Sequence, residues 1–154
     1  MKKTTSALLL IVLSIQAPLN AGIGSKDAVY IGGTASIKEM SEGKTSTADE
    51  KAFLFKYKAG KLLIPYDKIN ALEYGQKSGR RIGLAIAISP IALLSKKRKH
   101  FLTVNYIDDA DKQQAGVFEL GKDIVRTTLA SLEARSGRKI EYQDDEARKS
   151  GRGN

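Results

Sequence analysis

The sequence contains no cysteine and no tryptophan, and His100 is its single histidine among 154 residues. The absence of cysteine excludes disulfides, thiol nucleophiles and a lipid-anchored lipoprotein. One histidine leaves one candidate for a Ser-His-Asp arrangement and none for a paired-histidine metal site. Because His100 lies between four basic residues and an apolar strand pattern, a surface residue at a strand end is the simpler interpretation. We therefore predict no catalytic residue and no enzyme activity.

Signatures for metals and phosphate are incomplete. Asp108, Asp109 and Asp111 cluster between two apolar runs, but the glycine and bidentate glutamate of an EF-hand loop are missing. A solvated turn is therefore favoured over a calcium site. Gly121-Lys122-Asp123 joins a strand pattern to a helix pattern without the glycine-rich loop of a phosphate site. The sequence predicts no metal ligands and no cofactor.

No apolar run is long enough for an ordinary transmembrane helix, which needs about 20 residues. The first apolar run, Ala7 to Ile15, follows a pair of lysines and precedes Leu19-Asn20-Ala21. This order of basic, apolar and small residues is typical of a cleaved secretory signal peptide, here residues 1–21, with an uncleaved membrane anchor as the alternative. We expect export to the periplasm or cell envelope and a mature chain that opens with a polar lead at residues 22–27.

Negative charge is missing from one long stretch of the chain. No acidic residue lies between Glu73 and Asp108. The seven basic residues of this stretch carry the whole net charge of the mature chain, because the two leader lysines leave +7 of the formal +9. They flank 13 uncharged, mostly aliphatic residues from Ile82 to Leu94. The seven are Lys77, Arg80, Arg81, Lys96, Lys97, Arg98 and Lys99.

This basic-apolar insert, residues 77–99, has two interpretations. Its aliphatic side chains would enter the acyl boundary of a membrane while the cations meet anionic head groups, each adding about 1 kcal/mol before screening by salt. Alternatively, the apolar segment is buried in the domain core, against an envelope protein or against a second copy of the chain, because such a patch is a liability when exposed. Nucleic acid is disfavoured, since no aromatic residues interleave with the cations. The apolar contacts expected in either case are Ile86, Ile88, Ile91, Leu93 and Leu94.

Short apolar patterns of period two recur through most of the chain. The polar stretch from Glu39 to Asp49 is predicted to be a surface loop, and Ala59-Gly60 a tight turn. Paired glycines, Gly32-Gly33, allow a bulge in the first strand. Strands are predicted over residues 28–37, 51–58, 61–64, 69–74, 100–107 and 117–120.

A helix is predicted from Asp123 to Ser136. Asp123 suits the N-terminal end, where a carboxylate accepts backbone N–H groups, and Gly137 suits the C-terminal end. A brief extension at residues 139–142 precedes a charged tail, residues 143–154, which we expect to be disordered. The apolar face of the helix lies at i, i+4 and i+7 and comprises Val125, Leu129 and Leu132.

Two passages carry a resemblance to a known superfold. Leu63-Ile64-Pro65-Tyr66-Asp67-Lys68-Ile69 resembles the I-P-x-x-x-I passage of GRAM and bacterial PH-like domains, and Phe118 to Glu133 resembles their final strand and helix. The likeness spans residues 28–142 and implies an α+β fold, a PH-like bent antiparallel β-sandwich or partial barrel capped by one C-terminal helix. The first hairpin lacks a phosphoinositide motif, so phosphoinositide recognition is not implied.

The chain also resembles uncharacterised exported bacterial proteins that carry a hydrophobic insert before a Lys/Arg run. Together, these features predict a non-catalytic binding module of the cell envelope. We expect it to associate peripherally with anionic membrane through the insert. The alternative is a protein-interaction or self-association module that buries the same apolar segment.

Overall fold

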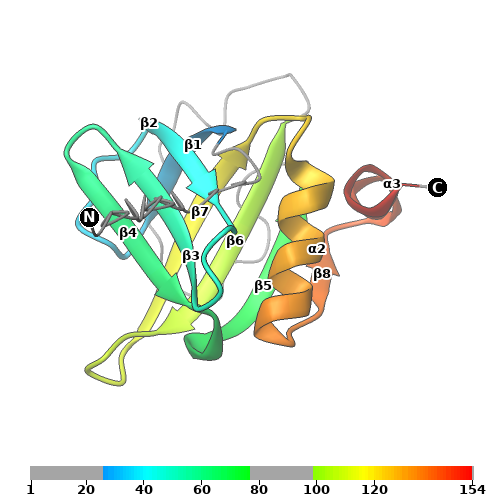
Figure 1. Cartoon of the computed structure of the whole chain (residues 1–154). Helices are drawn as coiled ribbons and strands as arrows, with labels where there is room; N and C mark the ends of the chain where they lie inside the picture. Colours follow the sequence, from blue (N-terminus) through cyan, green and yellow to red (C-terminus); the bar gives the residue numbers. More distant parts are fainter. Residues whose placement is uncertain (1–25, 77–98, 154) are drawn as a thin grey trace, which may run out of the picture.

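The computed structural model describes residues 26–76 and 99–153, which form one eight-stranded sheet and two α-helices (Figure 1). The predicted signal peptide, most of the lead and the insert as far as Arg98 lie outside these residues. The helices are α2 (Val125–Ser136) and α3 (Asp145–Arg152), and a 3₁₀ turn, η1 (Tyr66–Lys68), precedes β5. The strands are β1 (Lys26–Gly33), β2 (Ser41–Ser46), β3 (Ala52–Tyr57), β4 (Gly60–Pro65), β5 (Ile69–Gly75), β6 (His100–Ile107), β7 (Gln113–Leu120) and β8 (Ile140–Tyr142).

The strand order is β4-β3-β2-β1-β7-β6-β5-β8, so the sheet is open, with β4 and β8 as its edges. The α+β class is confirmed. Two details of the expected architecture are wrong: β8 pairs with β5 in parallel, and a second helix, α3, follows it. The parallel pairing arises because the chain crosses back along the sheet through α2 before β8 begins, whereas a hairpin would give an antiparallel pair.

One main apolar core lies on the inner face of the sheet. It joins residues from both ends of the strand order, such as Phe53 and Ile64 on one side and Leu72 and Ile140 on the other, so the sheet bends around it. The predicted alternation of β3 is confirmed, because Phe53 and Phe55 are fully buried whereas Lys56 is exposed. The predicted β3–β4 hairpin is also confirmed.

The first two strands differ from their predictions. β1 begins at Lys26, inside the expected lead, and its register against β7 shifts between Tyr30 and Gly32, which confirms the glycine bulge. The loop predicted over residues 39–49 is wrong, because β2 forms there and pairs with both β1 and β3. The composition of β2 is polar, but Gly43 lets β2 approach β3 closely. A Cβ at position 43 would meet the Phe55 ring of β3 at 2.7 Å.

Helix α2 closes the core with the predicted face. Its apolar residues at i, i+4 and i+7 are all buried. Gly137 ends the helix with φ of 69°, and its N–H donates to the carbonyl of Glu133 at 3.0 Å, as expected for a left-handed C-cap. The start is two residues later than predicted, because Ile124 occupies the N-cap position and its side chain enters the core.

The tail predicted to be disordered instead forms α3. The Asp144 side chain caps this helix by accepting from the Ala147 N–H at 2.7 Å. Ala147 is fully buried, and a Cβ at Gly151 would meet Tyr142, Leu129 and Tyr74 within 3.3 Å. Small residues one turn apart therefore let the helix pack closely on β5, β8 and α2, although its composition is highly charged.

Candidate functional site

The root of the predicted insert lies at one end of the sheet, where β5 ends and β6 begins. Gly75 pairs with Phe101, so the two ends of the intervening segment leave adjacent antiparallel strands. Hairpin loops usually contain about 2–5 residues, and loops beyond about 12–15 are uncommon outside functional or linker segments. Of the predicted contact residues, only Lys99 belongs to the described part of the chain. The others, Lys77, Arg80, Arg81, Lys96, Lys97, Arg98, Ile86, Ile88, Ile91, Leu93 and Leu94, lie outside it.

Lys99 is held on the outer face of the sheet. Its Nζ donates to Glu119 Oε2 at 2.8 Å, and the side chains are 28% and 22% exposed. Glu119 is in β7, opposite Phe101 of β6. This ion pair anchors the C-terminal root of the insert to the neighbouring strand.

His100 begins β6, as predicted, but it is half-buried rather than a surface residue. Its Nδ1 lies 2.6 Å from the Tyr74 hydroxyl, which lies 3.2 Å from Ser150 Oγ. Burial lowers the pKa of His100, the nearby Lys122 charge lowers it further, and Glu119 opposes them. Both His100 and Ser150 lie within hydrogen-bond distance of the Tyr74 hydroxyl, which joins the three residues in one cluster. It ties α3 to β5 and β6.

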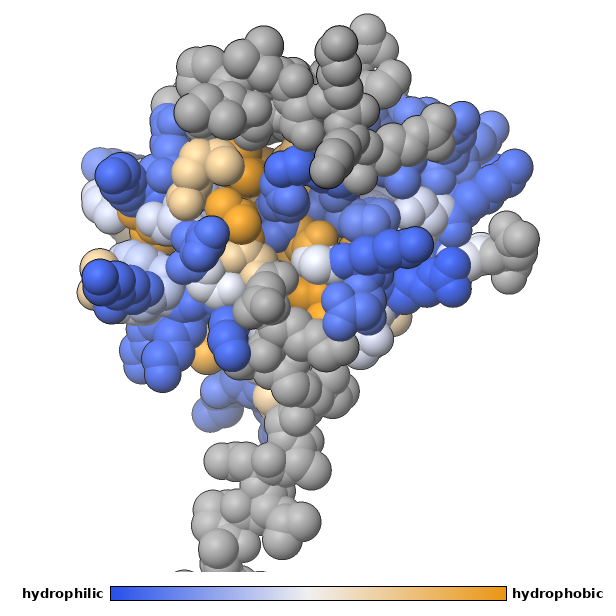
Figure 2. Space-filling model, turned by 90° about the horizontal axis from the view of Figure 1, so that it is seen from above, coloured by the Kyte–Doolittle hydropathy of each residue, from blue (hydrophilic) through white to orange (hydrophobic). Residues whose placement is uncertain are grey.

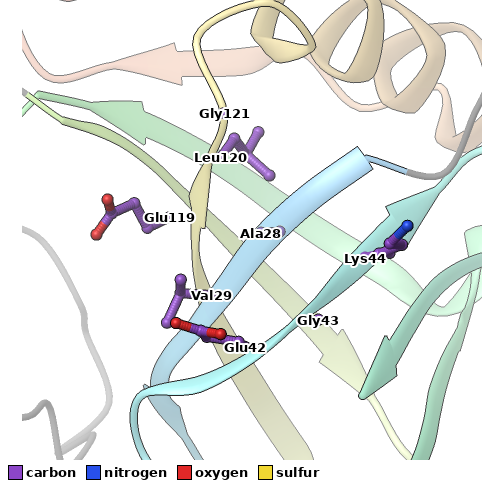
Figure 3. A pocket seen from close by; sticks show the side chains of 8 residues that line it. All are labelled: Ala28, Val29, Glu42, Gly43, Lys44, Glu119, Leu120 and Gly121. Carbon is purple, nitrogen blue, oxygen red and sulfur yellow. The ribbon is translucent and has the colours of Figure 1, made fainter. Parts of the chain in front are cut away.

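A groove of about 550 Å³ opens beside this end of the sheet, over β2, β1 and β7. Val29 pairs with Glu42 on one side and Glu119 on the other, and Figure 3 shows these three side chains projecting to the same side of the sheet. The groove therefore has an apolar centre between two carboxylates. The remaining lining residues are Ala28, Gly43, Lys44, Leu120 and Gly121. The sequence did not indicate this groove, because Glu42 was assigned to a loop.

A second, smaller apolar cluster lies on this outer face. Ile31, Phe101 and Val117 are buried there, with Val29 packed against them. Both α2 and α3 contribute to the main core on the opposite face. Figure 2, which looks onto the end where β6 begins, shows hydrophobic residues among hydrophilic ones there.

Another hollow, of about 530 Å³, lies at the opposite end, where η1 meets the end of α2. The Arg135 guanidinium lies 5.7 Å from the centre of the Tyr66 ring. Burial raises the pKa of the Tyr66 phenol, which has no hydrogen-bond partner among the described residues, while Arg135 opposes that rise. The hollow is lined by charged residues of both signs, so its lining favours neither a cationic nor an anionic ligand. These residues are Glu50, Lys51, Asp67 and Arg135.

The aspartate cluster forms a hairpin turn, as predicted. Asp108 Oδ1 accepts from the backbone N–H groups of Ala110 and Lys112, each at 2.9 Å, and Oδ2 accepts from Gln114 at 2.7 Å. These hydrogen bonds lower the pKa of Asp108, the Lys112 N–H having the largest effect. Across residues 26–76 and 99–153, no group of three metal-binding side chains is found.

The described residues contain no helix with the length and apolar character needed to cross a membrane. No protein-family model matches this chain, and no curated protein matches it.

Proposed function

We propose that this protein is a non-catalytic binding module of the cell envelope that associates peripherally with anionic membrane through the basic-apolar insert. The observation that carries the proposal is the place where the insert leaves the domain. Both of its ends emerge from adjacent strands, at Gly75 and Phe101, and the sequence between them holds all seven cations and the 13-residue apolar run.

The charge supplies most of the expected affinity. Each lysine or arginine near an anionic surface contributes about 1 kcal/mol, and salt reduces that contribution. The apolar run is too short to span a bilayer, which suits a segment lying at its boundary. The ion pair between Lys99 and Glu119 supports the proposal, since it holds the last residue of the insert against the neighbouring strand β7.

We further propose that the domain is a variant of the PH-like superfold. The bent sheet and the docking of α2 over its open core support this assignment. The parallel strand β8 and helix α3 would then be additions after the closing helix.

The alternative function is binding to a protein that covers the same apolar run. The groove supports this alternative, because the apolar Val29 lies beside the carboxylate of Glu42 in it, an arrangement complementary to a basic-apolar peptide. Such a module would need no anionic lipid.

Co-sedimentation with liposomes tests the proposal. A chain starting at Gly22 retains every described element, because β1 begins at Lys26. Binding should require anionic lipid and weaken with salt. It should fall in the variant with Lys96, Lys97 and Arg98 changed to glutamine, which leaves the Lys99 ion pair intact.

The matched control changes three exposed cations elsewhere to glutamine: Lys112, Lys139 and Lys149. Binding equal to the unmodified chain in the insert variant, or binding to neutral vesicles alone, would contradict the membrane function. In that case a search for protein partners would follow.

A further inference from the structure

Three lysines form a row across the outer face of β2, β3 and β4. Lys44 pairs with Lys56, and Lys56 pairs with Lys61, so their side chains project from the same face of adjacent strands. All three are exposed, and the row meets one acidic residue at its β1 end, where Asp27 pairs with Lys44. Adjacent strands lie about 4.8 Å apart, so the three positive charges are held close together.

This row opposes stability, since like charges directly opposite one another on a sheet are destabilising. Lysines often protect an exposed edge from pairing with other chains, which would explain Lys61 on the edge strand β4. That explanation fails for Lys44 and Lys56, because β2 and β3 have partners on both sides. The residues of β2, β3 and β4 include one acid, Glu42, which lies beyond the row.

Apolar side chains accompany the lysines on the same face. Leu54 pairs with Leu63, one row further along β3 and β4, whereas Phe53 and Phe55 point into the core. Leu63 is 45% exposed, the largest value among the exposed large hydrophobic residues of the described chain. We name this surface the lysine face, comprising Lys44, Lys56, Lys61, Leu54 and Leu63.

We infer that the lysine face is a second contact with an anionic phospholipid surface. The inference rests on the proposed membrane association and adds a contact from the folded domain itself. Cations beside an exposed leucine, Leu63, match the boundary between head groups and acyl chains, whereas a soluble polyanion would use the lysines and leave Leu63 in water. An anionic surface would also relieve the repulsion along the row.

The test compares two triple variants of the full mature chain on vesicles. One changes Lys44, Lys56 and Lys61 to glutamine. The other is the matched control at Lys112, Lys139 and Lys149, so both lose three exposed cations. The probes are vesicles of phosphatidylcholine and an equal mixture of phosphatidylcholine with phosphatidylglycerol. Each lysine near an anionic surface changes the dissociation constant about fivefold before screening by salt. We therefore expect the lysine-face variant to bind the mixed vesicles at least about tenfold more weakly than the control.

A thermal melt verifies that both triple variants fold. The single variant Leu63→Gln provides a second test, because it keeps every charge of the lysine face. Leu63→Gln should weaken binding to the mixed vesicles severalfold without changing binding to dextran sulfate, a soluble polyanion. Equal vesicle affinity of the lysine-face variant and the control would overturn the inference. So would a loss confined to dextran sulfate, which would indicate a polyanion site.

The outcomes separate this inference from the proposed function. If the insert variant loses vesicle binding while the lysine-face variant matches its control, the insert function stands and the lysine face is overturned. If only the lysine-face variant loses binding, the domain surface is the membrane contact and the insert function falls. Loss in both variants supports both proposals.

Discussion

Lys56 lies between Lys44 and Lys61 in the lysine row, so a single substitution there converts two repulsions into two attractions. Cross-strand pairs of this kind contribute roughly 0.2–1 kcal/mol each. Lys56→Glu should therefore raise the free energy of unfolding by a few tenths of a kcal/mol to about 1 kcal/mol, measured by urea denaturation. Lys139→Glu, at an exposed position outside the row, is the control. A Lys56→Glu variant less stable than the unmodified chain would show that the row is not a source of repulsion.

His100 makes the fold sensitive to pH. Burial, with a smaller effect from Lys122, lowers its pKa below the ordinary value of 6.5. The unfolded chain then binds the proton more readily than the folded chain, so stability is fully present above the unfolded pKa and falls as the pH drops through 6.5 towards the folded pKa.

The pH prediction is tested by the difference between two chains. From about pH 7.5 to about pH 5.5, the unmodified chain should lose more stability than His100→Gln, which cannot titrate there. Urea midpoints at both pH values give the comparison, since the carboxylates other than Glu119, which interacts with His100, contribute the same pH dependence to the stability of both chains. The same loss in both chains would exclude His100 as the group responsible.

At the scale of elements, the periodicity of the sequence predicted the strands and the helix whose formation depends on buried apolar side chains. The alternation in β3 and β5 and the stripe of α2 follow directly from bulky residues facing one core. β6 is instead buried on both faces over Phe101 to Val104, because Phe101 packs in the second cluster on the outer face. β2 and α3 were missed because their own residues carry little apolar signal. β2 is held by pairing with two neighbours, and α3 by the close fit of Ala147 and Gly151, which depend on residues far away in the sequence.

The docking of α3 is testable at Gly151. A side chain there would collide with Tyr142 and Leu129, so Gly151→Val should release α3 from the sheet. Hydrogen exchange of Asp145–Arg152 should become faster, while the strands of the main core keep their protection. Lys149→Val, at an exposed position of the same helix, is the control. Unchanged protection in Gly151→Val would show that the close packing does not hold the helix.

The candidate sites were the least predictable part of the molecule. The groove needs Glu42 and Glu119 on either side of Val29, and the lysine face needs three residues from three strands in one row. Both depend on strand register, which the sequence pattern alone did not give. The basic-apolar insert is contiguous in sequence, so its unusual charge could be recognised without the fold.

At the scale of the whole molecule, the described residues form one packed domain around the main core. The main core joins both ends of the sheet with α2 and α3. The root of the insert and the groove lie together at the end of the sheet where β6 begins. The lysine face lies on β2, β3 and β4, so both proposed contacts together would fix the orientation of the domain on a membrane.

Under the proposed function, the apolar run of the insert enters an anionic membrane. Because the chain has no cysteine, Ile88→Cys gives a single labelling site for a polarity-sensitive dye. Lys112→Cys, in the exposed hairpin turn, is the matched control. On mixed phosphatidylcholine and phosphatidylglycerol vesicles, the dye at position 88 should shift to the blue and the dye at position 112 should not. Vesicle-bound protein with no shift at position 88 would contradict the account.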